Sequence, residues 1–153
     1  MNEHQTRNAT GDFLVIGYGN LLRSDDGVGA KVAEAIGELH LPGVEILVSQ
    51  QLSPEHAEAI SRASTVVFVD AAVDAPKDVQ LRKLEPNESS QLMAHAADPR
   101  TMLALARDVF GHCPKAWWLT IPAATLDFGH DLSPAAREGF EKAIQEIKKL
   151  CGS

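Results

Sequence analysis

Short apolar runs alternate along the chain with segments in which apolar residues recur every three or four positions. Strands of the kind that helices cover on both faces are expected at Phe13–Ile16, Val44–Val48 and Thr65–Val69. Residues 28–39 place their apolar side chains on one helical face between the first two strands. The first third of the chain therefore predicts a strand, a helix and a second, parallel strand.

The rest of the chain continues the alternation. Residues 53–60, 98–111 and 133–149 predict helices, because each opens with Ser or Asp followed by Pro and carries an apolar stripe. Residues 79–84 predict an antiparallel edge strand, and Ala116–Ile121 predicts a last strand. The order predicts an α/β fold: a three-layer sandwich around a mostly parallel, doubly wound sheet of about five strands, with helices on both faces.

Composition narrows the class of protein. The 153 residues are 44% hydrophobic and 23% charged, as in a soluble globular domain. Residues 1–11 predict a flexible polar extension, and residues 12–153 predict a single domain. The net charge of -7 and the absence of basic runs argue against nucleic acid and anionic lipid as partners.

Other features of the sequence concern location and assembly. No apolar stretch approaches the ~20 residues needed to span a bilayer, and the polar N-terminus has no leader pattern, so a cytoplasmic protein without membrane contact is expected. Cys113 and Cys151 have no metal-site spacing and are expected to be free thiols. We expect a monomer.

Acidic residues follow two strands of the predicted sheet. In a doubly wound sheet the first and third strands lie side by side, and a ligand crevice opens at their carboxyl ends. The loop at residues 17–29, GYGNLLRSDDGVG, follows the first strand and carries Asp25 and Asp26, while Asp70 ends the third strand. The sequence therefore places three carboxylates at the expected ligand site.

A dinucleotide-binding loop is one interpretation of the two glycines that follow the first strand. The fingerprint G-x-G-x-x-G requires a third glycine at the position of Leu22. Asp25 and Asp26 would also repel a pyrophosphate at the start of the helix. Nucleotide binding is therefore disfavoured.

The loop resembles a motif of the nickel-iron hydrogenase maturation endopeptidases, G-x-G-N-x-L-x-x-D-[D/E]-G-x-G. Two further segments, VFVDAAVD and HAADPRTMLALA, are similar to the family's later motifs and occur in the same order. The resemblance covers residues 13 to about 150 and implies a protease-like α/β domain. The residues that match the loop motif are Gly17, Gly19, Asn20, Leu22, Asp25, Asp26, Gly27 and Gly29.

The resemblance implies a site and a reaction. Family members bind nickel through the positions that correspond here to Asp26, Asp70 and His95. Two carboxylates and an imidazole suit nickel, but also zinc, manganese or iron. The expected substrate is a nickel-loaded hydrogenase large-subunit precursor, whose C-terminal extension is removed. The nickel would arrive with this precursor, and the enzyme itself would hold no other cofactor.

Each candidate ligand also has a structural interpretation. Asp26 is suited to cap the following helix, although we assign that role to Asp25. Asp70 can satisfy backbone donors at the end of its strand, and His95 taken alone is a surface histidine. His4, His40, His56, His112 and His130 receive no role, and Asp74 is expected to solvate the loop after Asp70.

Glycine and asparagine in the motif loop leave further alternatives open. Gly27 and Gly29 weaken a helix start, which indicates close backbone approach either by a peptide partner or by the neighbouring loop. Asn20 is suited to a left-handed turn, and alternatively its side-chain amide could hold a strand of the substrate.

Alternatives also remain for the activity. No Ser/His/Asp order, Cys/His pair or H-E-x-x-H motif is visible, so cleavage would use metal polarisation of a carbonyl or a metal-activated water. Two other functions fit the sequence: a non-catalytic reader or chaperone of the precursor's nickel site, and a metal-dependent hydrolase of an unrelated substrate.

Overall fold

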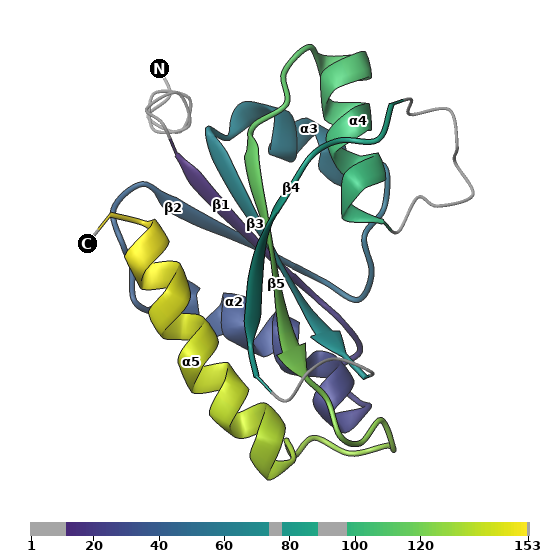
Figure 1. Cartoon of the computed structure of the whole chain (residues 1–153), viewed down its shortest axis with the longest axis vertical. Coiled ribbons are helices and arrows are strands. Elements are labelled where there is room, and N and C mark those ends of the chain that lie inside the picture. Colours follow the sequence, from purple (N-terminus) through teal and green to yellow (C-terminus); the bar gives the residue numbers. More distant parts are fainter. Residues whose placement is uncertain (1–11, 74–77, 89–97, 153) are drawn as a thin grey trace.

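A central five-stranded sheet flanked by helices organises the part of the chain that the computed structural model describes, residues 12–73, 78–88 and 98–152 (Figure 1). The elements follow the order that the hydrophobic pattern predicts. They are β1 (Phe13–Tyr18), the short 3-10 helix η1 (Ser24–Gly27), α2 (Val28–Glu38), β2 (Val44–Ser49), α3 (His56–Arg62), β3 (Thr65–Ala72), β4 (Gln80–Leu84), α4 (Pro99–Phe110), β5 (Lys115–Pro122) and α5 (Pro134–Leu150).

The strand order is β2-β1-β3-β5-β4, which confirms the doubly wound α/β fold. β1 pairs in parallel with β2 on one side and with β3 on the other. β3 pairs in parallel with β5, while β4 is antiparallel to β5 at the edge of the sheet, as expected for residues 79–84. The carboxyl ends of β1 and β3 therefore lie next to each other.

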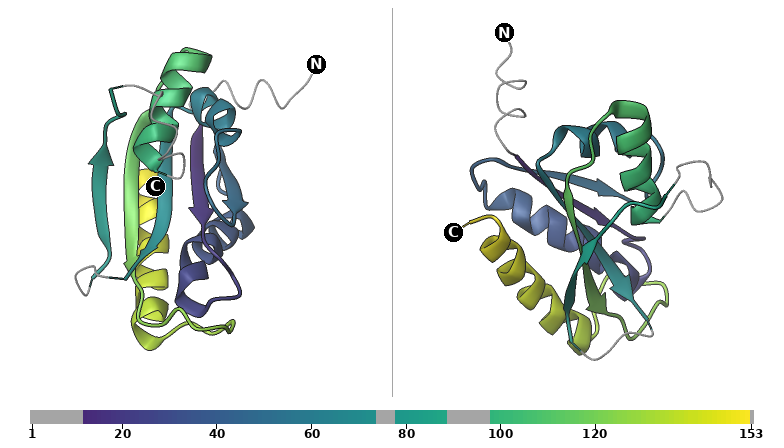
Figure 2. Two further views of the ribbon diagram at one scale, coloured as in Figure 1. Left: turned by 90° about the vertical axis from the view of Figure 1, so that its right-hand side faces the viewer. Right: turned by 45° about the horizontal axis from the view of Figure 1, so that its top comes forward.

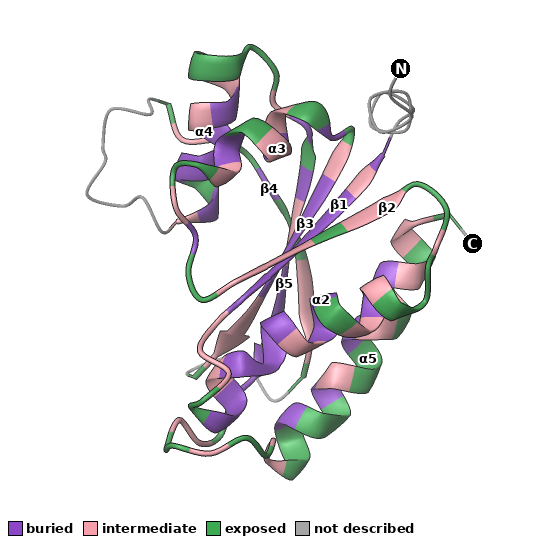
Figure 3. Cartoon of the chain, turned by 180° about the vertical axis from the view of Figure 1, so that it is seen from behind, coloured by how far each residue is buried: buried purple, intermediate pink, exposed green. Residues whose placement is uncertain are grey.

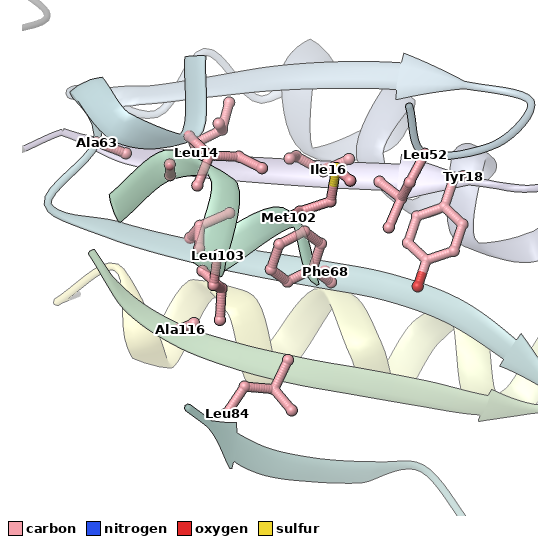
Figure 4. Packing of buried hydrophobic residues seen from close by; sticks show 13 residues of the cluster. Leu14, Ile16, Tyr18, Leu52, Ala63, Phe68, Leu84, Met102, Leu103 and Ala116 are labelled. Carbon is pink, nitrogen blue, oxygen red and sulfur yellow. The ribbon is translucent and has the colours of Figure 1, made fainter. Parts of the chain in front are cut away.

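Helices cover both faces of the sheet and enclose two hydrophobic cores. On one face, α3 and α4 pack on β1 and β3 through Ile60, Met102 and Phe68, all fully buried (Figure 4). On the other face, α2 and α5 pack on the same sheet and on each other (Figure 2). The outer surface of α5 is exposed, whereas its sheet-facing residues are buried (Figure 3). The three-layer sandwich is confirmed.

The helix boundaries follow local capping chemistry. Asp98 accepts a hydrogen bond from Arg100 N at 2.9 Å, and Ser133 accepts one from Ala136 N at 3.2 Å. Gly111 ends α4 with a φ of 88°, a left-handed conformation that glycine adopts without strain. The predicted start at Ser53 is wrong, because residues 53–55 form a turn and α3 begins at His56 without a side-chain cap.

Two further expectations concern the described residues. Cys113 and Cys151 are free, as predicted. Within residues 12–73, 78–88 and 98–152, no helix combines the length and the apolar character required to cross a membrane. Residues 1–11 lie outside the described part of the chain, so the N-terminal extension stays a prediction.

Candidate metal-recognition site

The carboxyl edge of the sheet brings together the loop after β1 and the end of β3. η1, which carries Asp26, contacts β3 close to the position where Asp70 lies. The two side chains are near enough for the charge of Asp26 to raise the pKa of Asp70. Two of the three predicted ligands therefore meet at one place, because β1 and β3 are neighbours in the sheet.

Asp70 is half-buried at the end of an apolar strand. Its Oδ2 accepts a hydrogen bond of 3.3 Å from the Tyr18 hydroxyl at the end of β1. Burial raises the pKa of Asp70 from 3.8 to about 6, and the charge of Asp26 adds to this effect. The hydrogen bonds from Tyr18 and from Ala71 N act in the opposite direction, because they stabilise the carboxylate. Asp70 is thus a carboxylate that burial and a like charge destabilise in the absence of a cation.

Tyr18 is a site residue that the sequence did not reveal, because the apolar run predicts a strand ending at Ile16 and leaves Tyr18 in the loop, whereas β1 extends to Tyr18. The ring lies in the core cluster on the face of the sheet that α3 and α4 cover (Figure 4), and its hydroxyl donates to Asp70. Burial raises the pKa of Tyr18 far above its ordinary value, and the charge of Asp70 raises it further. The phenol therefore stays protonated and donates to Asp70 at every physiological pH.

Asp26 is oriented by the tight turn that precedes it. Its Oδ2 accepts a 2.8 Å hydrogen bond from Asn20 N, while Asn20 Oδ1 accepts one of 2.9 Å from Leu22 N. Asn20 therefore binds Asp26 through its backbone N–H and braces the turn through its side chain, and the predicted left-handed conformation is wrong, since the only described non-glycine residues with positive φ are Ser24 and His40. Asp26 Oδ2 is held by this turn.

Asp25 has a different role from the helix cap that its position suggested. The cap of α2 is Gly27, and no side chain caps either η1 or α2. The fully buried Asp25 carboxylate instead accepts hydrogen bonds from Ser133 N at 2.8 Å and from the Ser133 hydroxyl at 2.6 Å. It also accepts from Ala124 N at 2.7 Å and from Thr125 N at 3.2 Å.

The Asp25 hydrogen bonds join two loops that are about 100 residues apart in the sequence. Burial raises the pKa of Asp25, but the bonds from Ser133, Ala124 and Thr125 outweigh this effect and leave the pKa below its ordinary value. Asp25 is therefore a buried, ionised anchor that fixes the loop after β5 against the loop that carries Asp26. The sequence offered no signal for its partners, because they follow a different strand.

Close internal packing explains the glycines of the motif loop. A Cβ at Gly29 would overlap the Val69 carbonyl, and one at Gly27 would lie 2.7 Å from Leu21 Cα. Gly19 combines a φ of 142° with close contact to the backbone of Asp26. Packing against neighbouring backbone, one of the two alternatives left open by the sequence, therefore accounts for Gly27 and Gly29.

His95 and Asp74 lie outside the described residues, so their predicted roles stay predictions. Among the residues that the structure does describe, no three His, Cys, Asp or Glu side chains gather in a way that could hold a metal ion. Asp26 and Asp70 are two of the three predicted ligands, and their carboxylates would supply oxygen donors. A third ligand from elsewhere is needed for a site of the predicted composition.

Comparison with curated protein sequences finds a related protein. No family model matches the chain. The chain is 26% identical over 144 residues to the hydrogenase expression/formation protein HupD of Thiocapsa roseopersicina. The match covers 88% of this chain and 65% of HupD, so this chain spans somewhat less than two thirds of its relative's length.

Solved structures share the fold. The hydrogenase maturating endopeptidase HybD from E. coli superposes with a TM-score of 0.67 at 24% identity, over 89% of each chain. The [NiFe] hydrogenase maturation protease HycI from Thermococcus kodakarensis KOD1 superposes with a TM-score of 0.70 at 18% identity, over 99% of this chain and 100% of HycI. The chain is thus similar in sequence to a hydrogenase maturation protein and has the fold of the hydrogenase maturation endopeptidases, which confirms the resemblance that its loop motif indicated.

Proposed function

We propose that this protein is an endopeptidase that removes the C-terminal extension of a nickel-loaded hydrogenase large-subunit precursor. The observation that carries the proposal is the meeting of Asp26 and Asp70 at the carboxyl edge of the sheet, in a fold shared with maturation proteases. Asp26, Asp70 and His95 would recognise the nickel, which belongs to the substrate.

The environment of the two carboxylates supports recognition of a cation. Asp70 is half-buried beside a like charge, and a divalent ion would relieve both penalties. Hydrogen bonds from Tyr18 and Asn20 occupy the Oδ2 atoms of Asp70 and Asp26 and so orient both groups. Carboxylate and imidazole donors are suited to complete the coordination of an ion that is held mainly by its precursor.

The chemistry of cleavage would then depend on the ion in the substrate. A divalent ion can polarise a peptide carbonyl or activate a water molecule. This protein would dock the precursor, hold Asp26 and Asp70 in fixed orientations and align the scissile bond. The long-range anchor at Asp25 supports that rigid geometry.

The direct experiment compares nickel-loaded with nickel-free precursor in the presence of the purified protein, with the mass of both chains followed by mass spectrometry. We expect trimming of the nickel-loaded precursor only, without free nickel in the buffer. Stable binding without any loss of mass would instead support the non-catalytic reader. Equal trimming of both precursors under a chelator would contradict nickel recognition.

Variants test the ligand assignment. Asp70→Ala and His95→Ala should each abolish processing, because each removes a proposed nickel ligand, and the fold should persist in Asp70→Ala because the change relieves a buried charge. Glu141→Gln and His40→Asn change an exposed acid and an exposed histidine outside the loops that carry the site, and they serve as controls. Cleavage at the parental rate by either ligand variant would refute the assignment.

Metal content separates this proposal from a general hydrolase. The purified protein should contain little metal and should unfold at the same temperature with and without a chelator, because two or three ligands on an open surface bind a free ion weakly. Elemental analysis that found one tightly held zinc per chain would favour a metal-dependent hydrolase of another substrate.

A further inference from the structure

Two large apolar side chains project into solvent beside the acidic site. Phe128 is 83% exposed and Leu22 is 55% exposed, and Phe128 is the most exposed large hydrophobic residue of the described chain. Leu22 lies four positions before Asp26 in the same loop. Single exposed apolar residues are common on proteins, but an exposed phenylalanine held next to a candidate site has an energetic reason to be covered.

Backbone hydrogen bonds hold these two side chains in place. Gly129 N donates to the Leu22 carbonyl at 2.8 Å, and Ser24 N donates to the Gly129 carbonyl at 2.8 Å. The Ser24 hydroxyl also donates to the Asp127 carbonyl at 2.8 Å. The exposure of Phe128 and Leu22 is therefore a feature of two paired loops.

The pairing of the two loops also fixes Leu22 and Phe128 relative to the candidate ligands. The buried Asp25 carboxylate binds both ends of the second loop, at Ala124 and at Ser133, and Asp25 is the direct neighbour of Asp26. The guanidinium of Arg23 lies 5.6 Å from the centre of the Phe128 ring, and Arg23 Nε donates to Leu126 O. The loops at residues 20–26 and 124–133, which carry Leu22, Phe128 and Asp26, are thus held together by these contacts.

We infer that Leu22 and Phe128, here called the apolar patch, dock an extended apolar segment of the precursor next to the scissile bond. This inference rests on the proposed function. Leu22 lies in the same loop as Asp26, and an extended polypeptide advances only ~3.4 Å per residue. A side chain within a few residues of the scissile bond would therefore reach the patch.

Charge narrows the kind of segment that fits. In the loops at residues 20–26 and 124–133, the acids that reach solvent are Asp26, Asp127 and Asp131, and the cation Arg23 is already engaged with Phe128. These acids repel an acidic segment. The docked segment is therefore apolar at its centre and carries no net negative charge.

Kinetics with the nickel-loaded precursor test the inference. Phe128→Ser and Leu22→Ser should each raise KM about tenfold or more and leave kcat within about twofold, because they remove apolar contact and no ligand. Phe110→Ser is the matched control, since Phe110 is 46% exposed at the end of α4, away from the carboxyl edge of β1 and β3. Circular dichroism melts should show the same Tm for all three variants, since the replaced side chains are exposed.

The outcomes distinguish the docking surface from the activity itself. If the parental protein does not cleave the precursor, the proposed function fails, and the patch is not the cause. If the parent cleaves and both patch variants keep the parental KM, the docking inference is overturned.

A photocrosslinker identifies the occupant directly. Benzoylphenylalanine at position 128 should crosslink the nickel-loaded precursor within a few residues of the cleavage site, whereas the same residue at position 110 should not. Crosslinks from position 128 to a second copy of this chain, to its own residues 89–97, or to a distant surface of the precursor would each refute the inference.

Discussion

The ionised Asp70 should lower the free energy of unfolding, and its replacement by asparagine measures this effect. The carboxyl group has a pKa of about 6 in the folded protein and 3.8 as its ordinary value, chiefly because of burial. The folded state therefore holds the proton more tightly than the unfolded chain does. Stability is lost as pH rises from about 4 to above 6, and asparagine, which does not ionise, escapes this loss.

The magnitude follows from the shift in pKa. A difference of about two units corresponds to about 3 kcal/mol at pH 7, when the folded carboxylate is mostly ionised. The buried amide retains part of the desolvation penalty, so we expect Asp70→Asn to raise the free energy of unfolding by about 1 to 3 kcal/mol. For a chain of this length, that corresponds to a rise in Tm of about 2 to 10 °C.

Urea unfolding between pH 5 and pH 8, in the presence of a chelator, is the appropriate assay. The stability gain of Asp70→Asn over the parent should be largest at pH 7 to 8 and should shrink towards pH 5. Asp127→Asn, a change of an exposed carboxylate, serves as the control and should show no such trend. A variant that is less stable than the parent at pH 7, or a gain independent of pH, would refute the reasoning.

Three further predictions address the residues around the site. Asp25→Ala should lower the free energy of unfolding by about 2 to 4 kcal/mol in urea at pH 7, because it leaves buried donors without a partner. The stability that Asp25 gives the parent should be lost as pH falls below about 4, since the folded state lowers the pKa of Asp25. Gly29→Ala should destabilise by at least about 1 to 3 kcal/mol in the same assay, because its methyl group would overlap the Val69 carbonyl. Tyr18→Phe should raise the pKa of Asp70 above about 6 in a carbon-13 NMR titration, since it removes a hydrogen bond to the carboxylate; an unchanged titration would show that Tyr18 does not act on Asp70.

The hydrophobic pattern was sufficient to predict the layers of this fold. β3 reads as a continuous apolar run because helices cover both of its faces, and residues 79–84 alternate because β4 lies at the edge. Sequence also located the caps at Asp98 and Ser133, where a side chain bonds a backbone N–H two or three residues away. The start of α3 was missed, since Ser53 has the right residue type but lies in a turn.

Local spacing by itself predicted that Asp26 lies in the loop after the first strand and that Asp70 lies at the end of the third, although β3 continues to Ala72, and the rules of doubly wound sheets placed those strands side by side. Only the tertiary structure decided what each acid contacts. Asp25 and Asp26 are adjacent in sequence, yet one is buried against Ser133 and the other is held by Asn20 near Asp70. The physical reason is that the hydrogen-bond partners and the burial of Asp25 and Asp70 arise from segments about 50 to 100 residues away, and residue type and spacing carry no record of them.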